Sequence, residues 1–202
     1  MKETRVYFVR HGAVERQTTR LSGRTPHLSL TRAGRAQAEA AALALSGRGI
    51  ETVMTSPLER AQETAEVIAG AAGAALLVDD DLNEIDFGDW SGAMFETLAG
   101  DPEWRIWNED RGRARPPHGE SMLEAQARVA RWLERARASA HNVIAAVSHG
   151  DVVRAAVAYT LGLPLHFYDR FDIDPGSITA ILMRGAEARL ISMNERPHVP
   201  TD

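Results

Sequence analysis

Short, almost continuously apolar runs recur along this 202-residue chain, separated by stretches with the composition of helices. The run at 143–147 contains only apolar residues, and 6–9 is a second such run. Strands that are apolar on both faces are typical of parallel sheets covered by helices on both sides, and the alternation of strands with helices indicates the same class. We therefore expect an α/β fold, a three-layer α/β/α sandwich with a mainly parallel sheet.

Capping residues mark where the expected helices begin. Thr31, Ser56 and Ser121 each stand where a helix N-cap is needed, and Pro57 would then occupy the first helical position. The expected helices cover 31–45, 56–70, a long segment from 121 onward, and 152–161. The expected strands cover 5–9, 52–55, 75–78, 143–147, 178–183 and 190–193.

Composition and charge limit the classes of function. A net charge of −5 and a pI of about 5.8 argue against nucleic acid as a partner. The absence of cysteine excludes disulfides, thiolate metal sites and a cysteine nucleophile. No signal peptide or membrane-spanning run is visible, so we expect a cytoplasmic protein that does not bind membranes. No repeat or linker divides the chain, which predicts one domain over 1–202, with an insertion at about 91–120 over the active site.

Two of the expected strands end at a histidine followed by glycine. Arg10-His11-Gly12 follows the 5–9 strand, and Ser148-His149-Gly150 follows the 143–147 strand. Ligands bind outside the carboxyl ends of the strands in open α/β sheets, so both imidazoles are expected at that edge. Taken alone, Arg-His-Gly is weak evidence of function, since most histidines beside a strand end are turn or core residues.

Two further segments carry candidate functional side chains. Arg60 lies about one turn into an expected helix, where free N–H groups favour anions; the alternative is a solvated arginine paired with Glu59 or Glu63. Glu84 and Asp86 are two residues apart and share a face in extended chain. They form either a polar edge strand or a pair in which one carboxyl group, kept partly dry by aromatic neighbours, exchanges a proton.

Five motifs occur in a fixed order along the chain: Arg-His-Gly at 10–12, Ser-Pro-Leu-x-Arg-Ala-x-x-Thr-Ala at 56–65, Leu-x-Glu-x-x-Phe-Gly-x-Trp at 82–90, Gly-Glu-Ser at 119–121 and Ser-His-Gly at 148–150. In this order the chain resembles the histidine phosphatase superfamily over about residues 5–193. That superfamily includes cofactor-dependent phosphoglycerate mutases, fructose-2,6-bisphosphatases and α-ribazole phosphatases. The resemblance implies a phosphoglycerate mutase-like fold.

The resemblance also implies a role for each matching residue. His11 would be the nucleophile that becomes phosphohistidine, and Glu84 the proton donor. Arg10, Arg60 and His149 would bind the phosphate. A neutral imidazole is a competent nucleophile, and cations around the equatorial oxygens are what phosphoryl transfer needs; a protonated His149 would add to them.

The chain departs from the family pattern in the loop after the first histidine. Ala13 and Val14 stand where mutases and bisphosphatases commonly carry glutamate and then serine or threonine. Gln17 takes the place of a family asparagine that touches the phosphate. Gln17, Gly23 and Gly150 are our candidates for substrate contact.

We therefore expect a phosphatase that hydrolyses a small phosphorylated metabolite through a phosphohistidine, with no metal and no cofactor. The expected partner is that substrate, with neither nucleic acid nor membrane, and a homo-oligomer is left open. The alternatives are a cofactor-dependent phosphoglycerate mutase and a non-catalytic phospholigand-binding module. The sequence does not name the substrate.

Several other features have a plainer explanation. We expect the basic cluster in the insertion to be a solvated loop rather than an anion clamp: Arg111, Arg113, Arg115 and nearby His118. Trp104 and Trp107 are expected to anchor the insertion, and 79–81, three aspartates, to form a solvated turn. No metal-site spacing is present among the remaining histidines, His27, His141, His166 and His198.

Overall fold

A six-stranded mixed sheet forms the centre of the protein, in a computed structural model that describes residues 2–15 and 19–199. The strands are β1 (Glu3–Arg10), β2 (Thr52–Thr55), β3 (Ala75–Val78), β4 (Val143–Ser148), β5 (Ile178–Arg184) and β6 (Glu187–Glu195). Their spatial order is β3-β2-β4-β1-β5-β6. The first four are parallel to one another, and β5 and β6 add antiparallel pairs at one side.

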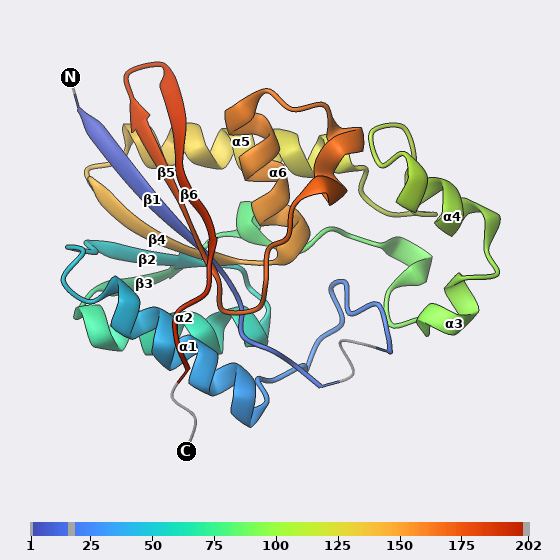
Figure 1. The fold of residues 1–202 in the computed structure, drawn as a ribbon, viewed down its shortest axis with the longest axis horizontal. Helices are drawn as coiled ribbons and strands as arrows, with labels where there is room; N and C mark the ends of the chain where they lie inside the picture. The colour runs from blue at the N-terminus through green and yellow to red at the C-terminus, as the bar shows by residue number, and fades with distance from the viewer. Residues whose placement is uncertain (1, 16–18, 200–202) are drawn as a thin grey trace.

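Helices cover both faces of this sheet (Figure 1). The α-helices are α1 (Arg32–Leu45), α2 (Glu59–Ala72), α3 (Phe95–Leu98), α4 (Pro102–Glu109), α5 (Met122–Ala138) and α6 (Gly150–Leu161). Three 3₁₀ turns join them: η1 (Asp80–Leu82), η2 (Gly88–Trp90) and η3 (Leu165–Arg170). Of these helices, α1 and α2 lie on one face and α5 and α6 on the other, which confirms the expected three layers (Figure 1).

Alternate residues of β1 pack into the two apolar cores. Tyr7 and Val9 face the alanine-rich surface of α1 and α2, whereas Val6 and Phe8 face α5 and α6. The Phe8 ring lies 5.4 Å from that of Trp132 on α5. Burial on both sides explains why this strand is apolar throughout.

The helix expected from Ser56 begins later than its sequence suggests. Ser56 donates its backbone N–H to the Val147 carbonyl of β4, so it continues the sheet edge instead of capping a helix. Leu58 is the N-cap and α2 starts at Glu59. Conversely, α6 starts at Gly150, two residues earlier than expected, with His149 as its N-cap.

The segment at 91–120 leaves the sheet and forms α3, α4 and their loops. It lies to one side of the sheet layers, beyond the carboxyl ends of the parallel strands (Figure 1). Asp101 caps α4 by accepting from the Glu103 N–H, and its other oxygen accepts from the Trp90 indole at 3.0 Å. Within the described residues, no helix is long and apolar enough to span a membrane.

A loop before β5 encloses the end of β1. The Arg10 side chain donates to the Ile173 carbonyl, and the Gly176 N–H donates to the Arg10 carbonyl at 3.0 Å. Asn194 of β6 holds this loop, because its amide oxygen accepts from the Asp174 N–H at 2.7 Å and its amide nitrogen donates to the Asp174 carboxylate at 3.1 Å. Asn194 has φ of 53°, a left-handed conformation that asparagine tolerates better than most residues.

The loop that follows β1 is pressed against the first turn of α1. A Cβ on Gly34 would lie 2.1 Å from the Ala13 carbonyl oxygen, although alanine is ordinarily the better helix former. We therefore expect Gly34→Ala to lower the free energy of unfolding by about 1–3 kcal/mol, the usual cost of overpacking. Urea unfolding followed by circular dichroism measures this.

The matched control is Gly70→Ala in α2, where an added Cβ meets no atom within 4 Å. That change should stabilise the protein, by up to about 1 kcal/mol. Equal effects of the two substitutions would contradict the close approach at Gly34.

Candidate active site

The carboxyl ends of β1 and β4 bring the two histidines together. These strands pair in parallel with Arg10 opposite Ser148, so the residues that follow, His11 and His149, emerge side by side. Their ring centroids are 5.1 Å apart, and both side chains are buried. The structure therefore joins the two motifs at one place.

Backbone and side-chain contacts orient the His11 ring. Its Nδ1 lies 2.7 Å from the Gly12 carbonyl oxygen. A carbonyl only accepts, so Nδ1 carries the proton and Nε2 of the neutral ring has a lone pair. Arg60 donates its Nε–H to that Nε2 at 3.2 Å. The nitrogen available for attack is thus Nε2.

Electrostatics keep both imidazoles neutral in the free protein. Burial, followed by the Arg60 and Arg10 cations, holds the pKa of His11 well below its usual value, despite the hydrogen bond to Gly12. Burial and Arg60 lower the pKa of His149 in the same way. His149 is therefore neutral in the free protein, and an anion beside it would raise its pKa.

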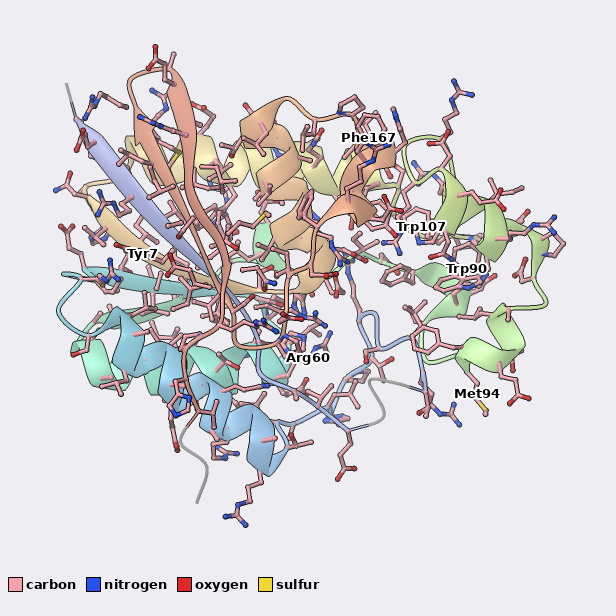
Figure 2. All side chains as sticks on the ribbon, viewed as in Figure 1. Tyr7, Arg60, Trp90, Met94, Trp107 and Phe167 are labelled. Carbon is pink, nitrogen blue, oxygen red and sulfur yellow. The ribbon has the colours of Figure 1, made fainter. Side chains whose placement is uncertain are left out.

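Two arginines, the buried Arg60 and the half-buried Arg10, supply positive charge beside these rings. Arg60 is 1% exposed, and it donates its Nη2 to the Gly23 carbonyl at 2.7 Å. The alternative pairing with Glu59 or Glu63 does not form; those carboxylates contact His27 and Arg35 instead. Figure 2 shows Arg60 near the middle of the molecule, between the α1–α2 layer and the ends of the strands.

Several buried nitrogens at this place have no hydrogen-bond partner among the described residues. They are Arg10 Nε, Arg60 Nη1 and His149 Nδ1. Burying such groups unpaired is costly, whereas an oxyanion would satisfy all of them. The starts of α2 and α6 lie directly beside them, and helix N-termini favour anions. The arrangement fits a phosphate group.

Glu84 lies against this cluster, two residues after η1. Its Oε2 is 3.9 Å from His149 Nδ1. Burial and the nearby Asp151 carboxylate raise the pKa of Glu84 to about 7, although Arg60 and Arg10 oppose the shift. A carboxyl group with such a pKa both gives and takes a proton near neutral pH. Asp86, by contrast, points away and pairs with Arg24 at 3.3 Å.

The structure describes two of the three candidate substrate contacts, Gly23 and Gly150. Gly23 and Gly150 line a cavity of about 280 Å³ together with Arg10, His11, Arg60 and Glu84. Gly150 fits closely, because a Cβ there would lie 3.3 Å from the Arg10 guanidinium carbon. Gln17 lies outside the described residues.

Phe87 of the third motif lines the cavity, which also contains residues outside the motifs. These are the aromatic Phe95 and Trp104 and the charged Arg20, Arg111, Asp151 and Arg154. Asp151 directly follows the Ser-His-Gly motif, and this position in the sequence could have indicated that it lies at the site. Ser56, expected as a helix cap, lies with its Oγ 2.8 Å from His149 Nε2 and so orients that ring.

The basic cluster of the insertion divides between two environments. Arg113 and Arg115 pair with Asp110 and Glu124, and His118 contacts Asp89, as expected of a solvated loop. Arg111 instead is buried and lines the cavity, which contradicts the expectation for that residue.

The two tryptophans of the insertion pack into its core, as expected. Trp107 is fully buried in the core under the insertion, and its ring stacks edge-on near Trp90 (Figure 2). Trp104 packs on Trp90 at 5.3 Å and also reaches the cavity. Asp79 and Asp81 form ion pairs with Arg135. The described residues include no group of three or more histidine, aspartate or glutamate side chains placed to hold a metal ion.

A comparison with protein families identifies this arrangement. Residues 6–196 match the model of the histidine phosphatase superfamily (branch 1). The chain belongs to the histidine phosphatase superfamily. Its α/β architecture, with phosphoglycerate mutase-like neighbours, confirms the expected fold class.

Individual members of this superfamily align over nearly the whole chain. An uncharacterised protein of Mycobacterium tuberculosis is 37% identical, covering 91% of this chain and 92% of its own length. The adenosylcobalamin/α-ribazole phosphatase of Escherichia coli is 31% identical, over 95% and 96% of the two chains. The solved structure of a mycobacterial glucosyl-3-phosphoglycerate phosphatase superposes with a TM-score of 0.86 at 28% identity, over 96% and 100%.

The raised pKa of Glu84 predicts a pH-dependent effect on stability. Because its folded pKa of about 7 exceeds its ordinary value, Glu84 contributes stability at low pH that is lost as pH rises through 7. Glu84→Gln does not titrate. The variant should therefore gain, relative to wild type, up to about 3 kcal/mol of unfolding free energy between pH 4.5 and 8.5. Urea unfolding across that range measures the gain.

Asp86→Asn is the control: it removes a carboxylate two residues away that is half-exposed and pairs with Arg24, so the wild-type pH dependence should remain. If Glu84→Gln and wild type show parallel stability curves, Glu84 is not the buried group described.

Proposed function

We propose that this protein is a metal-independent phosphomonoesterase that hydrolyses a small phosphorylated metabolite through a phosphohistidine at His11. The observation that carries the proposal is the buried His11 ring, whose Nε2 carries the lone pair and accepts from Arg60, in a site where Arg10, Arg60 and His149 each have a buried nitrogen without a partner. A nucleophile among oxyanion-binding groups is what phosphoryl transfer requires.

In the first half-reaction, His11 Nε2 attacks phosphorus and the bond to the leaving oxygen breaks. Arg10 and Arg60 neutralise the oxygens of the transferring group. His149 takes up a proton as the dianion enters, because the anion raises its pKa. Glu84, protonated near neutral pH, gives its proton to the leaving oxygen, so the product departs as an alcohol.

In the second half-reaction, the Glu84 carboxylate accepts a proton from water as that water attacks the phosphohistidine. The N–P bond breaks, inorganic phosphate leaves and Glu84 is again protonated. The geometry that supports this cycle is the proximity of Glu84 to His149, at 3.9 Å, beside the same cavity.

The same proposal treats the chain as one domain in which 91–120 is an insertion that covers the site and selects the substrate. Phe95, Trp104 and Arg111 of this segment line the cavity. Relatives are named for different phosphate esters, α-ribazole in one and glucosyl-3-phosphoglycerate in another. Family membership therefore does not identify the leaving group of the substrate.

Trapping the intermediate tests the nucleophile. Rapid acid-free quenching of turnover with a ³²P-labelled substrate should leave base-stable, acid-labile label on His11, and chelation of metals should not prevent it. His11→Ala should abolish labelling and reduce kcat by at least about 10³-fold, whereas exposed His27→Ala should change neither. Undiminished activity of His11→Ala would refute the proposal, and binding of phosphate esters without turnover would favour a non-catalytic module.

The proton-donor role predicts a dependence on the leaving group. Glu84→Gln should lower kcat/KM about 10²- to 10⁴-fold for alkyl phosphates, whose leaving oxygen needs a proton. The loss should be much smaller for 4-nitrophenyl phosphate, whose leaving group is stable as an anion. Steady-state assays of both esters, with Asp86→Asn as control, measure the difference. Equal losses on both esters would remove Glu84 as the acid.

A further inference from the structure

Ser56 lies where three segments of the site meet. Its backbone N–H donates to the Val147 carbonyl at 3.0 Å, which holds the residue beside the end of β4. Its side chain is buried, and its Oγ lies 2.8 Å from His149 Nε2 and 3.5 Å from Asn83 Oδ1. One hydroxyl group therefore contacts both the second imidazole of the site and the residue that precedes Glu84.

The surroundings of Ser56 limit where its single hydroxyl hydrogen can lie. The Leu58 N–H donates to Oγ at 3.3 Å, so the oxygen already accepts one hydrogen bond. Asn83 Oδ1 accepts the Glu84 N–H at 2.8 Å and is an oxygen with no hydrogen of its own. The hydroxyl hydrogen thus has two acceptors within reach, His149 Nε2 and Asn83 Oδ1, and the shorter contact is to the ring.

This arrangement favours one tautomer of the neutral His149 ring. When Ser56 donates to Nε2, that nitrogen holds the lone pair and the ring hydrogen lies on Nδ1. In the other tautomer Nε2 donates to Oγ, and the hydroxyl hydrogen is left with the long contact to Asn83. The first tautomer therefore has the better hydrogen bonds.

Nδ1 is the ring nitrogen that remains for a bound phosphate. It is buried with no hydrogen-bond partner among the described residues, and it lies 3.9 Å from Glu84 Oε2, on the side of a residue that lines the cavity. A hydrogen on Nδ1 can be donated to a phosphoryl oxygen, whereas a lone pair there would repel it. The charged and titratable groups that act on His149 are Arg60, His11, Arg128, Arg10 and Glu84.

The same hydroxyl also suits the protonated ring. When a bound dianion raises the pKa of His149, Nε2 carries the added proton and donates it to Ser56 Oγ. The hydroxyl hydrogen then turns to Asn83 Oδ1, 3.5 Å away. Each polar hydrogen keeps an acceptor in both charge states, and the exchange needs only a rotation of the hydroxyl group.

We propose that Ser56 is a positioning residue that holds neutral His149 with its hydrogen on Nδ1, and that Asn83 accepts the Ser56 hydrogen once His149 is charged. The proposal rests on the proposed phosphatase function and adds to it the group that prepares the phosphate-binding imidazole. Ser56 acts through His149, since it is not among the described residues that line the cavity.

The ¹⁵N NMR spectrum of the histidine rings tests the tautomer without turnover. Protonated and unprotonated ring nitrogens resonate in separate ranges, and comparison with His149→Gln assigns the signals of His149. The free wild-type protein should show a hydrogen on Nδ1 and a lone pair on Nε2. Ser56→Ala should shift the population toward a hydrogen on Nε2, whereas Ser56→Thr, which keeps a hydroxyl group, should retain the wild-type tautomer.

The affinity for inorganic phosphate measures the consequence for the site. Ser56→Ala should raise the Kd about 5- to 100-fold in calorimetric titrations, because a buried ring nitrogen of His149 loses its partner. Ser148→Ala is the matched control. Ser148 is equally buried, precedes His149 and donates its hydroxyl to the Leu82 carbonyl at 2.7 Å. This variant loses a buried hydrogen bond of the same kind and should keep the wild-type tautomer of His149.

The wild-type spectrum decides first and needs no variant that folds: a lone pair on Nδ1 of the free protein would overturn the proposal. An unchanged tautomer or an unchanged phosphate affinity in Ser56→Ala would also overturn it, as would the same tautomer shift in Ser148→Ala. Absence of 4-nitrophenyl phosphate hydrolysis by wild type would instead overturn the phosphatase function, and the tautomer would still be measured independently.

Discussion

The parallel pairing of β1 with β4 is the constraint on which the site depends. With Arg10 opposite Ser148, both strands end together and deliver a histidine to the same point. A shift of one residue in this register would turn the apolar side chains of β1 into the wrong core and separate the two imidazoles. The same apolar packing that stabilises the sheet therefore sets the geometry of the candidate site.

Much of this architecture was predictable because its causes are local. The sequence placed β2 and β3 at their observed bounds, and Ser121 caps α5 as expected, where the structure adds a capping box with Glu124. The start of α2 was wrong because Ser56 bonds to β4, a partner distant in sequence. Motif order, not periodicity, was what pointed to His11, Arg60 and Glu84.

The rest of the site depends on contacts that sequence patterns do not carry. Arg111 and Arg113 have identical side chains two residues apart, yet one is buried against Asp151 and the other is solvated. Their environments differ because the packing of 91–120 against α6 buries Arg111 and leaves Arg113 exposed. Likewise, the low pKa of His149 follows from burial beside Arg60, which no local pattern encodes. Such cations and neutral imidazoles form a site that is electrostatically incomplete until an anion enters.

The two hydrogen bonds between Asn194 and Asp174 have a consequence for folding during synthesis. Arg10, which we propose binds the phosphate, belongs to the first strand, but the loop that holds it is fixed by the last strand. During synthesis from the N-terminus, β1 leaves the ribosome early and has both its neighbours in the sheet only after β4 and β5 have followed. A nascent chain that stops short of Asn194 lacks the hydrogen bonds between Asn194 and Asp174 that hold this loop. The support of Arg10 is therefore complete only when the final strand has formed.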